Sequence, residues 1–207
     1  MGQALCLRDL MKSHIRIALI LFFLFTLLTG VIYPLVVTGI SQVAFPHRAN
    51  GSVVERDGQP IGSELIGQQF DEPRYFWGRL SATEKVPYNA ASSGGSNLGP
   101  TNDNLMKKIN ERIEAIRQAH PEQEGPIPID LVTASASGLD PHISPAAAEY
   151  QVSRVAKARG MSEDSVRQLV ASLTEGRTLG LLGEPRVNVL ALNLALDKSP
   201  QSGTHSR

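Results

Sequence analysis

An uninterrupted apolar run near the N-terminus constrains this chain more than any other feature. No charged residue occurs between Ile17 and Pro46. About 20 helical residues cross a hydrocarbon layer of about 30 Å, and this run is longer than that. A helix in the core of a soluble domain would show a polar face, and none is present here. The sequence therefore predicts a transmembrane helix over residues 17–43, preceded by a cytoplasmic segment over residues 1–16.

A cleaved signal peptide is the main alternative, because Gly39-Ile40-Ser41 could pass as a cleavage site. The apolar part of a signal peptide covers at most about 15 residues, so the length of the run favours a retained anchor. An excess of basic residues marks the cytoplasmic side of a span, and this excess lies on the N-terminal side. We therefore expect a cytoplasmic N-terminus and a domain outside the cytoplasm. The basic residues are Arg8, Lys12 and Arg16 before the span, against Arg48 and Arg56 after it.

Small residues and a proline inside the span predict contact with another membrane helix. Small residues let two backbones approach closely in lipid, and a proline frees a carbonyl that needs another donor. Glycine and proline are also common in membrane helices in general, so both interpretations stay open at this point. The candidate interface residues are Thr26, Gly30, Tyr33, Pro34, where we expect a kink, and Gly39.

The remaining composition is that of one ordinary soluble domain. The chain of 207 residues carries 20 Lys+Arg and 20 Asp+Glu, so no basic surface marks a nucleic-acid binder. The single cysteine, Cys6, lies ahead of the span, which excludes a disulfide within the soluble part and any cysteine-based metal site. The five histidines do not have the spacing of a metal site.

Local patterns divide residues 47–197 into strands and helices. Two β-like runs flank Asp57-Gly58, which predicts a hairpin, and the alternation between residues 127 and 131 predicts a strand. Residues 81–101 are rich in small residues and predict a loop. The run 187–196 is apolar enough for a core, but its periodicity does not separate strand from helix.

Capping signals predict three helices in the same region. The first begins after Thr101 or Asn102 and ends before Pro121. The second begins at Ser144-Pro145 and ends at Gly160, and the third begins at Ser162 and ends at Gly176. The fold class is therefore a single N-terminal transmembrane helix plus one α+β soluble, extracytoplasmic domain over residues 47–197, with a polar tail over residues 198–207.

Two segments could carry chemistry, although the chain has neither a Walker-type phosphate loop nor a G-x-S-x-G elbow. A Gly-rich loop ahead of a helix N-terminus can bind phosphate through its backbone amides, but no companion lysine is present and Gly-Gly pairs often only turn the chain. The candidate nucleotide-binding residues in this loop are Ser93, Gly94, Gly95, Ser96 and Asn97.

The second segment brings Ser135 and Ser137 close in sequence to Asp140 and His142. These residue types suggest a serine hydrolase, but a catalytic triad is defined by geometry rather than by sequence proximity. Small residues between a strand and a capped helix explain the same composition. We expect no metal site and no catalytic residue in this chain.

Several sequence blocks are specific in combination. They are Tyr33-Pro34-Leu35, Gly62 to Gln68, Tyr75-Phe76-Trp77-Gly78-Arg79, Pro87-Tyr88-Asn89, Ser93 to Leu98, Val132 to Asp140, Arg154 to Arg159 and Val187 to Asp197. Together they resemble the C subunit of the bacterial Kdp high-affinity potassium-transporting ATPase. The resemblance extends from about Ile17 to Asp197, and Met1 to Leu10 looks like an extension, with Met11 as a second candidate initiator.

The resemblance implies a non-catalytic accessory subunit of the bacterial inner membrane, with a periplasmic main domain. Its partners would be the lipid bilayer, a potassium-channel-like pore subunit and the P-type pump subunit, whose D-K-T-G-T phosphorylation motif is missing from this chain. The subunit would stabilise the complex and raise the affinity of the pump subunit for ATP, with no cofactor bound firmly to this chain.

The predicted topology separates this domain from ATP in the cytoplasm. Any effect on ATP affinity should then travel through the membrane helices as coupling between sites. If the domain were cytoplasmic, the Gly94-Gly95 loop would become a nucleotide contact. The alternative functions are accordingly a membrane-anchored nucleotide-binding module or a membrane-anchored serine hydrolase.

Overall fold

The computed structural model describes the backbone of residues 2–199 and the side chains from Lys12 to Ser199. Predictions about Met1, the Cys6 side chain and the tail from Pro200 onward fall outside these described residues. The chain divides into two compact units, residues 1–52 and residues 53–207.

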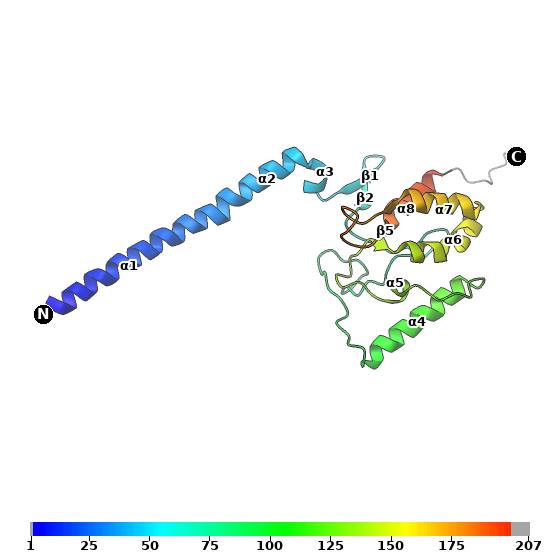
Figure 1. The fold of residues 1–207 in the computed structure, drawn as a ribbon, viewed down its shortest axis with the longest axis horizontal. Helices are drawn as coiled ribbons and strands as arrows, with labels where there is room; N and C mark the ends of the chain where they lie inside the picture. Colours follow the sequence, from blue (N-terminus) through cyan, green and yellow to red (C-terminus); the bar gives the residue numbers. More distant parts are fainter. Residues whose placement is uncertain (1, 200–207) are drawn as a thin grey trace. The chain divides into compact units, whose positions relative to one another are not determined.

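The first unit is a long helix followed by one short turn of helix (Figure 1). It consists of α1 (Gly2–Leu27), a π-helical turn η1 (Leu28–Ile32), α2 (Tyr33–Ala44) and α3 (Pro46–Ala49). Its segment Lys12–Ala44, 33 residues long, is the one helix of the described residues that is long and apolar enough to cross a membrane. The length and apolar composition of this segment confirm the predicted single N-terminal membrane helix.

The proline is accommodated by the π-helical turn that precedes it. Pro34 has no amide N–H, and in a regular α-helix its ring would clash with the carbonyl four residues earlier. The helix widens at this place, so that the Tyr33 amide donates to the carbonyl of Leu28, five residues back. Such a π-bulge is one of the recognised causes of distortion in a helix.

The second unit begins with the predicted hairpin. Strands β1 (Val53–Arg56) and β2 (Gln59–Ser63) pair antiparallel with a bulge between Val54 and Glu55. The two turn residues both have positive φ angles, 53° for Asp57 and 75° for Gly58. A two-residue turn with this conformation matches the twist of the strands, and the prediction from Asp57-Gly58 is confirmed.

The capping signals place two of the three predicted helices correctly. Helix α4 (Asp103–Ala119) is capped by Asn102, whose side chain accepts from the Asn104 amide. Helix α6 (Pro145–Arg159) is capped by Ser144 and ends at Gly160, whose φ is 65°. Glycine adopts this left-handed conformation with the least strain, because it has no Cβ.

The third helix is shorter than predicted. Helix α7 (Glu163–Ser172) begins at its Ser162 cap as expected but ends before Leu173, not at Gly176. Residues Thr174–Glu175 instead form strand β4, because they pair with strand β5 (Arg186–Asn188). Tertiary pairing therefore overrides the glycine signal at this end.

The run 187–196 changes from strand to helix at Asn188. Strand β5 lies between β3 (His142–Ile143) and β4 in an antiparallel three-stranded sheet. Helix α8 (Val189–Lys198) follows at once, with the Asn188 side chain accepting from the Ala191 amide. Both alternatives that the periodicity left open are present in one continuous run.

The strand predicted between residues 127 and 131 is wrong, because the structure has the short helix α5 (Ile129–Val132) there. Leu131 and Val132 are both buried although they are adjacent, whereas Ile129 is 75% exposed. Neighbouring residues on a strand point to opposite faces, so a strand could not bury this pair on one side.

One hydrophobic core lies among the helices of the second unit. Helices α6, α7 and α8 lie together, and α4 runs along another edge of the unit (Figure 1). The largest fully buried apolar side chains are Phe76, Ile116, Leu131, Ile143, Leu192, Leu196, Val152, Val155, Val166 and Val187. The mixed helix and strand composition of the domain is confirmed.

Candidate functional site

The membrane helix presents its side chains without cover from the rest of its own unit. Phe23 is 66% exposed, Tyr33 65% and Leu35 67%. Nothing lies within 4 Å of the position of an added Cβ at Gly30 or at Gly39. The five candidate interface residues named from the sequence are thus all accessible on this helix.

An extended segment through Phe76 and Trp77 is held by side-chain amides instead of by a neighbouring strand. Asn193 accepts from the Phe76 amide (2.8 Å) and donates to the Phe76 carbonyl (3.0 Å). Gln151 accepts from the Trp77 amide (2.8 Å) and donates to the Trp77 carbonyl (3.1 Å). Each amide thereby replaces one residue of a β-ladder, and we call Asn193 and Gln151 the amide clamp.

Arg154 connects the amide clamp to a buried histidine. Its guanidinium donates to Gln151 (2.8 Å), to the carbonyls of Pro73 and Tyr75, and to Nε2 of His120 (2.9 Å). Burial, opposed by a hydrogen bond with the Ile116 carbonyl and assisted by the nearby Arg154 charge, lowers the pKa of His120 to about 4. His120 is therefore neutral at pH 7.

The same guanidinium lies over an aromatic face. Arg154 is 4.5 Å from the centroid of the Trp77 ring, and Arg112 is 5.4 Å from it. Burial lowers the pKa of Arg154 to about 10. The indole ring and main-chain carbonyls thus bind the guanidinium groups of Arg112 and Arg154. This network holds the Trp77 segment in place. The network has a structural role, which the sequence does not indicate because its residues are far apart along the chain.

The end of the domain is joined to its beginning at Asp197. The carboxylate accepts from Arg159 (2.9 Å), from the Tyr75 hydroxyl (3.3 Å) and from Arg56 (3.4 Å). Burial raises the pKa of Asp197, but the bonds from Arg159, Tyr75 and Arg56 outweigh it, so the pKa is lowered overall. Helix α8 is thereby connected to the hairpin, to α6 and to the aromatic segment.

The long loop between β2 and α4 is anchored by Tyr88. Its hydroxyl donates to the Arg79 carbonyl (2.6 Å), and burial raises its pKa to about 12. A Cβ at Gly67 or Gly78 would lie 2.3 Å or 2.7 Å from Tyr88 atoms. These glycines make room for the ring, which gives three of the specific sequence blocks a packing role.

The Gly-rich loop packs on the segment that contains the candidate hydrolase serines. The Gly94 amide donates to the Ser137 carbonyl (2.9 Å), and the Ser93 hydroxyl donates to the same carbonyl (3.1 Å). A Cβ at Gly95 would lie 2.7 Å from the Ala136 carbonyl oxygen. The Gly94 amide is therefore already engaged, and Gly95 allows the two chain segments to pack closely.

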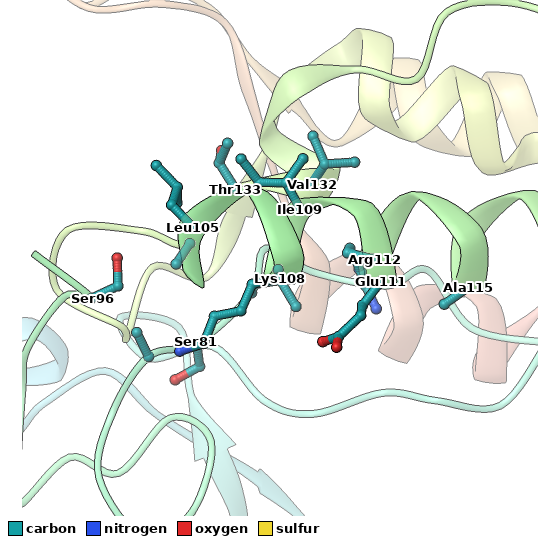
Figure 2. A pocket seen from close by; sticks show the side chains of 13 residues that line it. Ser81, Ser96, Leu105, Lys108, Ile109, Glu111, Arg112, Ala115, Val132 and Thr133 are labelled. Atoms are coloured by element: carbon teal, nitrogen blue, oxygen red, sulfur yellow. The ribbon is translucent and has the colours of Figure 1, made fainter. Parts of the chain in front are cut away.

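A groove of about 370 Å³ lies beside this loop, between α4 and residues 80–82 and 132–134. Figure 2 shows Leu105, Ile109 and Val132 forming an apolar wall, with Lys108 extending from α4 along the groove. Of the candidate nucleotide-binding residues, Ser96 lines the groove. The Arg112 side chain is turned inward, where it donates to the Leu131 carbonyl (3.1 Å).

The serines do not form a hydrolase constellation with His142. Among the described residues, no hydrogen bond joins Ser135 or Ser137 to His142, and the Ser137 hydroxyl accepts from the Leu139 amide (3.1 Å). Asp140 lies 3.3 Å from Nδ1 of the His142 side chain and accepts from the His142 amide (3.0 Å) and from Arg79 (3.1 Å). Burial raises the pKa of Asp140, but these hydrogen bonds outweigh it and lower the pKa. The carboxylate closes a turn.

An exposed leucine loop follows β4, outside the candidate residues named from the sequence. Leu179, Leu181 and Leu182 are 87%, 81% and 64% exposed. The Thr178 amide donates to the Leu182 carbonyl (2.8 Å). Positive φ angles at Leu179, Gly180 and Gly183 and the ion pair of Arg177 with Glu184 (2.8 Å) give the loop a defined shape. The pattern Leu-Gly-Leu-Leu-Gly between two charges was the available signal.

Comparison with known proteins gives consistent results over almost the whole chain. The family model described as K+-transporting ATPase, c chain, matches residues 15–198. A potassium-transporting ATPase KdpC subunit of Sorangium cellulosum is 63% identical over 187 residues, which cover 90% of this chain and 98% of that protein. KdpC subunits of Herpetosiphon aurantiacus and Polaromonas naphthalenivorans are each 62% identical and cover 91% and 90% of this chain, and 97% and 95% of their own lengths.

Proposed function

The chain belongs to the KdpC family of potassium-transporting ATPase subunits, and on this premise we propose that it is a non-catalytic accessory subunit that assembles and stabilises the complex. Its partners are a channel-like pore subunit and a P-type pump subunit. The accessory role raises the affinity of the pump subunit for ATP. ATP itself binds to the pump subunit.

The membrane helix is the observation that supports this proposal most directly. No residue of the segment from Lys12 to Ala44 is buried. In lipid, apolar side chains alone do not drive helices together, and close packing at small residues does. The accessible Gly30, with Thr26 one turn before it, offers such a surface to a helix of the pore or pump subunit.

The ATP effect is coupling between two distant sites. The basic residues before the span favour a periplasmic domain in the bacterial inner membrane, and the engaged Gly94 amide argues against a phosphate cradle in the Gly-rich loop. A change in ATP affinity can then arise only if this chain favours one conformation of the pump subunit.

Co-purification tests the assembly role. The Gly30→Leu variant places a large side chain on the proposed interface, and we expect less of it to remain with the other subunits in mild detergent. Ala18→Leu is the matched control on the same helix and should assemble normally. Equal retention of both variants with full potassium transport would refute this interface.

Two further measurements separate the parts of the proposal. A complex purified without this chain should require more ATP for half-maximal hydrolysis, and an unchanged requirement would refute the effect on affinity. A compartment-specific reporter fused after Asp197 should give the periplasmic signal. A cytoplasmic signal would refute the orientation and would make direct contact with ATP the better hypothesis.

A further inference from the structure

Neither helical hydrogen-bonding pattern gives the Thr29 carbonyl, in the described part of the membrane helix, a main-chain donor. In an α-helix the Thr29 carbonyl would accept from the Tyr33 amide, but that amide donates to Leu28 instead. In a π-helical pattern it would accept from residue 34, which is proline and has no N–H. Both helical patterns therefore leave the Thr29 carbonyl without a partner.

This carbonyl lies far from the headgroups and from bulk water. Thr29 lies 12 residues after Ile17 and 15 before Ala44, where the helical segment ends. At about 1.5 Å per residue these separations are roughly 18 and 22 Å, which exceed the half-thickness of the hydrocarbon layer, about 15 Å. An unpaired carbonyl at this depth is strongly unfavourable.

The surroundings leave the carbonyl accessible from one side. Gly30 follows it directly, and apart from its chain neighbours and the adjacent helical backbone no atom lies within 4 Å of an added Cβ there. The Thr29 hydroxyl is not available as a donor, because it donates to the Phe25 carbonyl (2.7 Å). Bonding of this kind to the residue four positions earlier is common for threonine in helices.

We propose that the Thr29 carbonyl accepts a hydrogen bond from a polar side chain on a membrane helix of a partner subunit, which approaches over Gly30. The proposal rests on the accessory role in the complex described above and adds the chemistry of the contact. The donor is a hydroxyl, amide or indole N–H group, since such groups can lie in a membrane helix and hydrogen-bond across the interface. Pro34 creates the acceptor and Gly30 opens the approach.

Carbonyl labelling tests this contact in the full chain. The dipeptide Thr-Gly occurs twice, at 29–30 and at 38–39. Solid-state NMR of a chain with ¹³C-carbonyl threonine and ¹⁵N-glycine therefore resolves these two carbonyls alone. Thr38 lies inside α2 (Tyr33–Ala44) and serves as the internal control.

We expect the Thr29 carbonyl signal to move downfield, the direction of hydrogen-bond formation, when the chain passes from bilayers alone into the assembled complex. The Thr38 signal should stay in place. A Thr29 signal that is the same in both samples would overturn the proposal. An unchanged upfield signal would mean that no hydrogen bond forms, and an unchanged downfield signal would mean that water, lipid or the chain itself supplies the donor.

The Pro34→Ala variant provides a second measurement. It restores an amide and removes the cause of the π-helical turn, so that Tyr33 can donate to Thr29. We expect its Thr29 signal to be downfield before assembly and its affinity for the other subunits to fall about threefold, while the control Val36→Ala keeps its affinity. Full affinity of Pro34→Ala would contradict the proposal. Failure of the unmodified chain to bind the other subunits would instead refute the accessory function.

Discussion

Removal of one arm of the amide clamp should destabilise the domain severely. In the Asn193→Ala variant, the Phe76 amide and carbonyl lose the bonds of 2.8 and 3.0 Å that they make with this side chain. Phe76 is 0% exposed and Asn193 1%, so water cannot replace the lost partners without opening the core. The perturbation leaves two backbone groups buried and unpaired.

The expected loss follows from these two groups. Each buried unsatisfied polar group costs about 1–3 kcal/mol, which gives about 2–6 kcal/mol for the pair. Position 193 lies within α8, where alanine is a better helix former than asparagine by up to about 0.7 kcal/mol. The free energy of unfolding should therefore fall by about 1–5 kcal/mol.

Urea denaturation of the full chain in detergent measures this loss. Trp77 is the only tryptophan and lies next to the affected residue, so its fluorescence reports the segment directly. Asn110→Ala, at an exposed position of α4, is the matched control and should change the free energy by less than about 0.5 kcal/mol. A loss below about 1 kcal/mol for Asn193→Ala would refute the clamp as a main support of the fold.

Three further predictions concern other parts of the domain. The folded-state pKa of His120 is lowered from 6.5 to about 4. The stability that the neutral His120 contributes is present above pH 6.5 and is lost as pH falls toward 4, so the free energy of unfolding should decrease by up to about 3 kcal/mol in this window. Urea titrations of the His120→Gln variant should show a weaker pH dependence. Replacement of Leu179, Leu181 and Leu182 by serine should leave the urea midpoint almost unchanged because these side chains are exposed; a large shift of the midpoint would show that the leucines support the fold. Ser144→Ala removes the cap of α6 and should cost about 1–2 kcal/mol, and an unchanged midpoint would contradict this role.

Local sequence signals succeeded wherever one short segment determines the structure. The Asp57-Gly58 turn has the positive φ angles of a hairpin, and the Ser144 cap with Gly160 delimits α6. The membrane helix follows from length and lack of charge alone. In each case the signal and the structure that it determines are only a few residues apart.

Signals failed where distant residues decide the structure. The apolar alternation before Val132 suggested a strand, but the pair Leu131 and Val132 packs into the core from a helical turn. The amide clamp joins positions 117 residues apart in the case of Phe76 and Asn193. An asparagine inside a helical segment carries no local mark of a backbone partner so far away.

The Asp197 junction has a consequence for the biosynthesis of the domain. Asn193 and Asp197 are nearly the last described residues, yet they hold Phe76, Tyr75 and Arg56 near the start of the domain. A chain that emerges from its N-terminus can pair Trp77 with Gln151 once α6 is made, but it must wait for α8 before Phe76 gains its partner Asn193. Until then the backbone of that segment is open to chaperones, proteases and other chains, and a message truncated shortly before residue 193 would yield an anchored protein whose domain cannot close.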